Sequence, residues 1–555
     1  MTDRLVIALA QLNPTMGALQ ANCDLLRKAR AEAAGEGAHL LVASELFVTG
    51  YPPEDLVRKP AFLAATREVV ETLAQETGDG GPALLIGAPW QDDGKVYNAA
   101  LVLDGGQIQS IRYKYDLPNY SVFDEKRVFE AGPLPGPVNF RGVRLGVMVC
   151  EDMWTPEVTE CLEESGAEIL VVPNGSPYEA AKVDHRIQLA VARVTESGLP
   201  LIYVNQVGGQ DELVFDGASF VLGGDCALRA QLPALEPALA VTHWRRDPES
   251  DAWSCAEGSL SPPEQGSEQI YRALMVGLRD YVDKNGFPGV VIGLSGGIDS
   301  ALSAAVAADA LGAQRVRCIM MPSPYTSQDS LDDAAACAEH LEIQLDEIAI
   351  QPAMEAFGAM LMPLFNGMKA DITEENIQAR ARGLTLMAIS NKLGHMVLST
   401  GNKSEMSVGY ATLYGDMCGG FNVLKDVYKT EVYKLARWRN QAKPRGALGP
   451  AGRVIPERII TRAPSAELRP DQTDQDSLPP YDALDDMLEC LIEKELTVAE
   501  IAQRGHDPEV VKRVWRMLDN AEYKRRQAAP GVKITERAFG RDRRYPITNA
   551  FKGPF

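Results

Sequence analysis

The sequence predicts an α/β protein that is built from two domains. Short apolar runs alternate with helical stretches in the first half of the chain, and a second alternation of strands and helices begins near residue 270. A chain of 555 residues also exceeds the length over which one hydrophobic core keeps growing. We therefore expect a first domain over residues 1–245, a linker over 246–269 and a second domain over 270–555.

Six apolar runs with the character of β-strands define the first domain. Several of them end in a charged or polar side chain, as at Glu45, Cys150 and Asn174. Short β-rich runs separated by helical segments indicate a layered α/β domain, and strand ends are where such folds hold their sites. The runs cover residues 4–12, 39–46, 83–89, 143–150, 168–174 and 199–206.

The second domain has the βαβ order that is typical of a doubly wound parallel sheet. The linker before it is acidic, contains Pro, Ser and Gly, and is poor in aliphatic residues. The expected strands lie near 289–294, 316–322, 344–350 and 395–400, with helices that include residues 329–341 and 373–394. A stretch with seven prolines, 439–480, shows no periodicity, so we expect it either to be ordered by packing against the domains or to form a mobile lid. A helical subdomain follows from Tyr481 onward.

Charge and cysteine usage exclude several classes of partner. The formal net charge of −21 argues against nucleic acid and anionic membranes, because both would repel the chain, although small anionic ligands respond to local charge. No run of about 18 apolar residues could span a bilayer, and the first residues lack a secretory cleavage pattern. Nine scattered cysteines without a CxxC pair favour a reduced, cytoplasmic protein.

The glycine-rich loop "GLSGGIDS" after a buried strand has the features of a phosphate site. Its glycines let backbone N–H groups turn toward a phosphate, and the helix that follows adds the positive end of its dipole. The lysine of a Walker-type loop is absent. Asp299 would repel a phosphate unless it held a cation, which indicates Mg²⁺. Thr400 ends a later strand, and Glu405 lies just beyond it as a second carboxylate for that Mg²⁺. We expect Lys403, Lys425 and Lys429 to bring positive charge toward the phosphates.

This loop resembles the signature of ATP-pyrophosphatases, which cleave ATP between the α- and β-phosphates and adenylate their substrate. The stretch 398–416, together with 375–383, 468–482 and 522–535, resembles the synthetase domain of NAD⁺ synthetases. The resemblance implies that Asn376, Glu405 and Lys524 contact deamido-NAD⁺. It assigns ATP to Gly293, Leu294, Ser295, Gly296, Gly297, Ile298, Asp299, Ser300, Thr400 and Lys429.

Cys150 is the candidate nucleophile of the first domain. It ends an apolar run, so we expect a tight turn that raises the thiol above the sheet. Glu45 could take the thiol proton, and Lys114 could stabilise a thiolate or an oxyanion. In the order Glu, Lys, Cys, these residues resemble the triad of the nitrilase, or carbon–nitrogen hydrolase, superfamily. That resemblance implies an αββα sandwich, a supporting role for Glu125, and contacts to glutamine from Tyr120, Ser176 and Lys182.

Over its whole length the chain resembles the family of glutamine-dependent NAD⁺ synthetases. The implied substrates are glutamine, ATP and deamido-NAD⁺, and the implied products are NAD⁺, AMP, pyrophosphate and glutamate. Because water would hydrolyse the adenylate and protonated ammonia is not a nucleophile, we expect an internal ammonia channel between the domains. The resemblance also implies a homo-oligomer.

Two other interpretations remain. The first is a nucleotide- or tRNA-modifying ATP-pyrophosphatase; the acidic charge argues against tRNA, and the 468–482 block argues against other amidations. The second is a regulatory binding module in which one or both sites are inactive, although all the reactive side chains are present.

Overall fold

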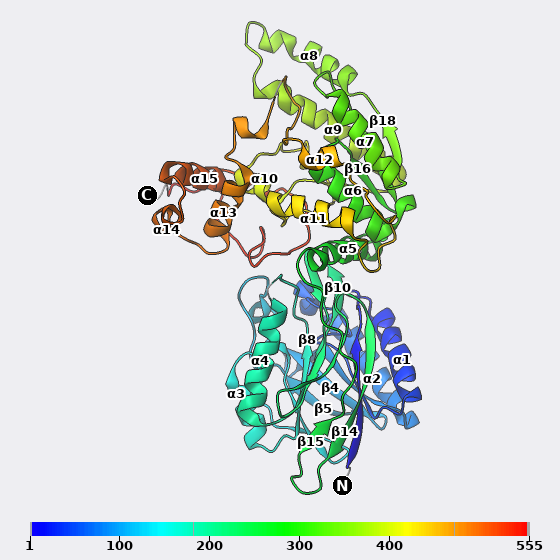
Figure 1. Cartoon of the computed structure of the whole chain (residues 1–555). Coiled ribbons are helices and arrows are strands. Elements are labelled where there is room, and N and C mark those ends of the chain that lie inside the picture. The colour runs from blue at the N-terminus through cyan, green and yellow to red at the C-terminus, as the bar shows by residue number, and fades with distance from the viewer. Residues whose placement is uncertain (1–2, 181, 471, 552–555) are drawn as a thin grey trace. The chain divides into compact units, whose positions relative to one another are not determined.

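The computed structural model describes residues 3–180, 182–470 and 472–551, without the side chains of residues 182 and 183. The chain divides into two compact units, Met1–Glu264 and Gln265–Phe555, which are described separately below (Figure 1).

Two β-sheets form the centre of the first unit. The first is seven-stranded, with the order β15 (Trp253–Cys255), β14 (Ala238–Arg246), β1 (Arg4–Gln11), β2 (Leu40–Val42), β3 (Ala83–Asp92), β4 (Lys95–Asp104) and β5 (Gln107–Tyr113). The second is six-stranded, with the order β13 (Leu228–Gln231), β12 (Phe220–Leu222), β9 (Leu201–Asn205), β8 (Ile169–Asn174), β7 (Val143–Val147) and β6 (Val138–Phe140). A small hairpin is formed by β10 (Val207–Gln210) and β11 (Leu213–Asp216).

The sheets pack face to face between two layers of helices, which confirms the αββα sandwich. One core collects apolar side chains from both sheets, for example Leu9 and Val171. The outer face of the first sheet packs against α1 (Leu19–Gly35) and α2 (Pro60–Glu76). The outer face of the second packs against α3 (Pro156–Glu164) and α4 (Lys182–Ser197), on the opposite side of the unit in Figure 1.

The central strands of both sheets are parallel, and their carboxyl ends carry the candidate residues. Strand β2 pairs in parallel with β1 and β3, and β8 with β7 and β9. The other strands of the two sheets pair antiparallel. Part of the expected linker departs from the prediction, because Trp253–Cys255 pairs with β14 as the edge strand β15 and buries Trp253.

The second unit contains a five-stranded parallel sheet, as the sequence predicts. Its order is β18 (Gln344–Glu347), β17 (Val316–Met320), β16 (Val290–Gly293), β19 (Met396–Ser399) and β20 (Phe421–Asn422). The order reverses between β16 and β19, where doubly wound folds bind their ligands beyond the strand ends. The helices around it are α5 (Ser267–Lys284), α6 (Ile298–Leu311), α7 (Gln328–His340), α8 (Gln351–Phe365), α9 (Ile372–Leu393), α10 (Lys403–Val408), α11 (Lys429–Gln441) and α12 (Glu457–Thr461).

A helical subdomain packs against α10. Its apolar core takes side chains from α13 (Tyr481–Ile492), α14 (Val498–Gln503) and α15 (Pro508–Asn520), and α10 contributes Met406 and Val408. The short α16 (Glu522–Arg525) follows α15.

The proline-rich stretch is held by packing, the first of the two expected alternatives. Arg439, fully buried at the end of α11, pairs with Asp309 and donates to the carbonyl of Pro450 at 2.6 Å. Asn440 donates to the carbonyl of Ile455 at 2.7 Å.

A membrane span requires a helix that is both long and apolar. In the part of the chain that the structure describes, no helix meets both requirements.

Candidate active sites

Cys150 lies on a strained turn directly after β7. The strand ends at Val147, and Cys150 opens a short 3₁₀ turn with φ +49°. Non-glycine residues rarely occupy this left-handed region, and such strain concentrates at functional sites. The expected tight turn is therefore confirmed, and Cys150 is only 2% exposed.

Lys114 joins two glutamates beside this turn. Its ammonium is fully buried and lies 2.7 Å from Oε1 of Glu45 and 2.9 Å from Oε1 of Glu125. Glu45 follows β2, Lys114 follows β5, and Cys150 follows β7, so strand ends from both sheets supply the cluster. This arrangement fixes the ammonium in position, because a buried charge that loses its oppositely charged partner is left uncompensated.

Two residues that the sequence analysis did not select hold the glutamates. Asn98 donates to Oε1 of Glu45 at 2.7 Å, and the hydroxyl of Tyr51 donates to Glu125 at 2.8 Å. The backbone N–H of Gly175 donates to the second oxygen of Glu45 at 2.9 Å. Neither Asn98 nor Tyr51 carries a motif that would have identified it.

Burial and neighbouring charges set the protonation states of this cluster. Burial raises the pKa of Cys150 well above its ordinary value, Glu45 adds to the shift and Lys114 opposes it. The thiol is consequently protonated at neutral pH, and its attack requires a base. Burial alone would lower the pKa of Lys114, but Glu125 and Glu45 raise it well above the usual value. Burial raises the pKa of Glu125 to about 7, with Lys114 opposing the shift.

Asp152, which the sequence analysis also missed, connects the cysteine turn to the lysine segment. One carboxylate oxygen accepts from the backbone N–H groups of Tyr115 and Asp116, at 3.0 and 2.8 Å. The other accepts from the N–H of Val149 at 2.9 Å. One buried side chain thus fixes the residues next to Lys114 and those next to Cys150.

The three residues assigned to glutamine differ in their surroundings. Tyr120 is 47% exposed, and its hydroxyl donates to Glu151, the residue after the nucleophile, at 2.9 Å. Ser176 is buried, and its hydroxyl accepts from Arg186 at 3.1 Å. The side chain of Lys182, at the start of α4, lies outside the described residues.

The glycine-rich loop of the second unit connects β16 to α6. Gly296 has φ +79°, and a Cβ at this position would lie 2.3 Å from the carbonyl oxygen of Ser330. Only glycine fits this turn. Ser300 holds the loop closed, because its hydroxyl accepts from the N–H of Ser295 at 3.2 Å and donates to the carbonyl of Gly297 at 3.0 Å.

A cavity of about 290 Å³ opens above this loop. All ten residues assigned to ATP line it: Gly293, Leu294, Ser295, Gly296, Gly297, Ile298, Asp299, Ser300, Thr400 and Lys429. It lies beyond β16 and β19, at the point where the strand order reverses. Residues that the sequence analysis did not select also line it, among them Arg382, Asp416 and Arg462. Arg462 reaches the loop from the proline-rich stretch and donates to the carbonyl of Gly296 at 3.2 Å.

The two proposed metal ligands converge on one ammonium. Lys429 lies 2.5 Å from Oδ2 of Asp299 and 2.9 Å from Oε1 of Glu405. Burial raises the pKa of Glu405 to about 7, with Lys429 opposing the shift and Asp299 adding to it. No group of three or more His, Cys, Asp or Glu side chains suited to a metal occurs among the described residues. Two carboxylates with space for phosphates nevertheless fit Mg²⁺, which often takes one or two carboxylates plus substrate oxygens.

Asn376 and Lys524 hold a loop at the edge of the cavity. Asn376 accepts from the hydroxyl of Thr412 at 3.1 Å. Lys524 donates to the carbonyls of Gly409 and Ala411, at 2.7 and 2.6 Å. Ala411 lines the cavity, whereas Asn376 and Lys524 are not among its described lining residues.

The expectation that three lysines bring positive charge toward the phosphates is wrong for Lys403 and is not confirmed for Lys425. Among the described lining residues, Lys429 is present and Lys403 and Lys425 are not. Lys403 is the first residue of α10, and its buried side chain pairs with Asp426, which lies between β20 and α11, and with Glu493, just after α13.

Comparisons with known families agree with the two sites. A family model for carbon-nitrogen hydrolases matches residues 6–247, and one for NAD synthase matches residues 270–528. Fold and matches together define a two-domain protein that combines a carbon–nitrogen hydrolase with an NAD synthase.

Full-length relatives make the assignment more specific. The glutamine-dependent NAD(+) synthetase of Rhodobacter capsulatus is 51% identical over 552 residues and covers 100% of both chains. The synthetase of the same name from Thermotoga maritima is 43% identical over 581 residues, with 99% and 100% covered. A solved glutamine-dependent NAD+ synthetase from Acinetobacter baumannii, in complex with ADP, is 42% identical with a TM-score of 0.78, covering 98% of this chain and 99% of that one. The chain belongs to the family of glutamine-dependent NAD⁺ synthetases.

Proposed function

We propose that this chain makes NAD⁺ from deamido-NAD⁺, using ATP to activate the acid and glutamine to supply the nitrogen. The observation that carries the proposal is the presence, in one chain, of a buried Cys–Glu–Lys cluster and a lysine-free phosphate loop within a cavity. The first could release ammonia, and the second could consume it.

In the first unit, Cys150 acts as nucleophile and Glu45 as general base. The Cys150 sulfur attacks the side-chain amide carbon of glutamine while Glu45 takes the thiol proton. Lys114 stabilises the oxyanion of the tetrahedral intermediate. When the intermediate collapses, Glu45 returns its proton to the leaving nitrogen, which departs as ammonia. Glu45 then takes a proton from a water molecule, whose oxygen attacks the thioester carbon. The C–S bond breaks, glutamate leaves, and Glu45 returns the proton to the Cys150 sulfur.

In the second unit, the loop binds the pyrophosphate part of ATP. Backbone N–H groups of the loop and the N-terminus of α6 face the phosphates, and Lys429 supplies positive charge. Mg²⁺ held by Asp299 and Glu405 would neutralise phosphate charge when bound. The carboxylate of deamido-NAD⁺ attacks the α-phosphorus and pyrophosphate leaves. Ammonia then attacks the acyl carbon of the adenylate, and NAD⁺ and AMP are released.

Ammonia transfer within the protein is part of the proposal. Free ammonia is mostly protonated at neutral pH, and water competes for the adenylate. Holding ammonia next to the adenylate and excluding water can lower the barrier of such a reaction by up to about 7–11 kcal/mol. A homo-oligomeric assembly and a cytoplasmic location stay predictions of the family resemblance.

The test compares two nitrogen sources. The Cys150→Ala variant should lose glutamine-dependent NAD⁺ formation by at least about 10³-fold and retain synthesis from ammonium. The matched control is Cys161→Ala, a half-buried thiol on α3 of the same unit, which should retain both activities. Continued use of glutamine by Cys150→Ala would show that the nucleophile is wrong, and absence of NAD⁺ from wild-type protein with either source would refute the function.

A further inference from the structure

Helix α10 faces the ATP cavity with one side of its first turn. Asn402 caps the helix: its side-chain oxygen accepts from the N–H of Glu405 at 3.0 Å, and its amide nitrogen donates to Oδ1 of Asp299 at 2.8 Å. Glu405 reaches Lys429 from the same side. The position of α10 therefore determines where two polar side chains, Asn402 and Glu405, lie beside the phosphate loop.

The opposite side of the same turn carries a fully buried ammonium. Lys403 donates to Oε1 of Glu493 at 2.6 Å, to the hydroxyl of Thr535 at 2.6 Å and to the carbonyl of Arg537 at 2.9 Å. It also lies 2.8 Å from Oδ1 of Asp426. Lys403 has 0% of its side chain exposed, so the proposed reaction cannot use it as a ligand for phosphate.

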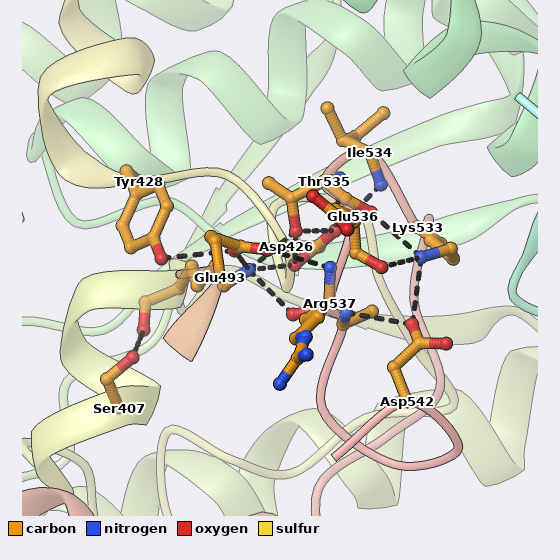
Figure 2. A network of polar contacts seen from close by, with 12 residues as sticks. Ser407, Asp426, Tyr428, Glu493, Lys533, Ile534, Thr535, Glu536, Arg537 and Asp542 are labelled. Atoms are coloured by element: carbon orange, nitrogen blue, oxygen red, sulfur yellow. Dashed lines mark hydrogen bonds and ion pairs between the residues drawn. The ribbon is translucent and has the colours of Figure 1, made fainter. Parts of the chain in front are cut away.

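The two carboxylates that meet Lys403 also hold the C-terminal segment 533–542 (Figure 2). Asp426 accepts from the backbone N–H groups of Ile534 and Thr535, at 2.8 and 2.7 Å. Glu493, just after α13, accepts from the N–H of Arg537 at 2.8 Å. One ammonium thus links α10, α13 and a segment more than a hundred residues further along the chain.

The charges of this network depend on one another. Burial would raise the pKa of Asp426, but Lys403 and Lys533 outweigh burial and hold it below the ordinary value. Removal of one partner from a buried ion pair leaves the other charge uncompensated, which is strongly unfavourable. Loss of the Lys403 ammonium would drive Asp426 and Glu493 toward water and release α10 from the C-terminal segment.

We propose that Lys403 is a positioning residue for the synthetase reaction: it fixes α10 to the C-terminal segment and thereby holds Asn402 and Glu405 in place beside Asp299. This inference rests on the proposed function of the second unit. The next residue of α10 supports this proposal. The hydroxyl of Ser404 donates to Asp485 of α13 and accepts from the backbone N–H of Lys429. The contact thus ties the start of α11, which carries Lys429, to α10 and α13.

The experiment replaces the ammonium without shortening the side chain. With ammonium as nitrogen source, Lys403→Met should raise the KM for ATP by about 10- to 100-fold, since small displacements of positioning groups have effects of this size. Lys403→Arg, which keeps a buried cation, should recover part of the loss. The affinity for ADP in the presence of Mg²⁺, measured by calorimetry, should fall in parallel.

Lys533→Met is the matched control. Lys533 is also buried: it pairs with Asp542 at 2.8 Å, donates to the carbonyls of Thr535 and Glu536, and acts by its charge on Asp426, whereas Lys403 reaches the same network from α10. Loss of Lys533 should lower the melting temperature and leave the KM for ATP unchanged. Glutamine hydrolysis in each variant reports whether the first unit is intact.

Each result supports or overturns the inference. If Lys403→Met has fewer active sites but an unchanged KM for ATP, Lys403 contributes only to stability. If Lys533→Met raises the KM as much as Lys403→Met does, the link that Lys403 makes between α10 and the C-terminal segment has no specific role. If Lys403→Met is insoluble, Thr535→Val decides, because it removes one partner of the Lys403 ammonium: a raised KM supports the inference, and an unchanged KM contradicts it. Failure of wild-type protein to form NAD⁺ from ammonium would instead refute the proposed function.

Discussion

At the scale of single residues, Glu125 shows how a buried contact can make an activity depend on pH. Its carboxylate accepts from the ammonium of Lys114 and from the hydroxyl of Tyr51. Because burial raises its pKa to about 7, it is charged above pH 7 and neutral below. The neutral form holds the Lys114 ammonium less strongly, so protonation should loosen the group that stabilises the oxyanion.

We therefore expect glutamine hydrolysis by wild-type protein to fall by about tenfold per pH unit below pH 7. Glu125→Gln resembles the protonated state, and at pH 8 it should be about 10- to 100-fold slower, the size of a lost charged hydrogen bond. In Glu125→Gln, the fall of the hydrolysis rate below pH 7 should also disappear, because the amide does not titrate. Initial rates of glutamate release between pH 5.5 and 8.5 measure both effects. An unchanged acid limb in Glu125→Gln would assign that titration to another group.

Asp299 supports a prediction for the second site. It is the carboxylate of the loop itself and bonds to both Lys429 and Asn402. Asp299→Ala should abolish NAD⁺ synthesis from glutamine and from ammonium alike, because the phosphates and Mg²⁺ would lose this anchor. Glutamine hydrolysis, which belongs to the first unit, should continue and serves as the folding control. NAD⁺ formation at a wild-type rate would rule out the metal role of Asp299.

The reactive residues were predictable because their chemistry is unusual for their position. Glu45 and Cys150 end apolar runs, where an ordinary strand would continue into a turn. Asn98 and Tyr51 are different, since a buried amide and a buried phenol occur in many cores and only the folded geometry brings them to the glutamates. Lys403 was wrongly expected near the phosphates, because one position in a short helix decides whether a side chain meets phosphate or protein.

At the scale of elements, the loop between β16 and α6 depends on the shape of its backbone. Gly296→Ala would combine strain at φ +79° with a collision against the carbonyl of Ser330. The loop must shift, so the KM for ATP should rise by about tenfold or more. Gly312→Ala is the control. Gly312 follows α6 with φ +82°, and a Cβ at this position would lie no closer than 3.8 Å to another residue, Leu448. The variant should lose about 1–3 kcal/mol of stability, because φ +82° with ψ 147° is a conformation that residues other than glycine rarely adopt, and it should retain the KM.

Thermal melting and ATP kinetics on both variants separate strain from loop geometry. If Gly312→Ala raised the KM as much as Gly296→Ala, the effect would come from general destabilisation of α6, and the close approach to Ser330 would have no specific role.

The elements that the sequence predicts are those with a clear period. Parallel strands such as β8 and β16 are continuous apolar runs and were found within a few residues. Helix α8 was missed because it is apolar along most of its length, contains Pro363 and buries none of its residues, so it lacks an amphipathic pattern. Strand β15 was missed because its three residues lie in an acidic, proline-containing stretch.

At the scale of the whole molecule, the two units have separate cores and separate sites. The first unit is a sandwich with its cysteine beyond parallel strands, and the second is a doubly wound sheet with its cavity at the reversal of strand order. The sequence predicted this division because each half carries its own alternation of strands and helices. The proposed function nevertheless requires the two sites to cooperate, since the product of one is the nucleophile of the other.

The final prediction tests that cooperation with an ammonium trap. Glutamate dehydrogenase with 2-oxoglutarate and NADPH consumes free ammonium in the assay solution. If ammonia passes from Cys150 to the adenylate without leaving the protein, the trap should leave NAD⁺ formation from glutamine unchanged. The same trap should suppress NAD⁺ formation from added ammonium, which is the control that the trap works. Equal suppression with both nitrogen sources would mean that ammonia is released to solvent, and the advantage of joining a glutaminase to a synthetase in one chain would then lie in coordinated production alone.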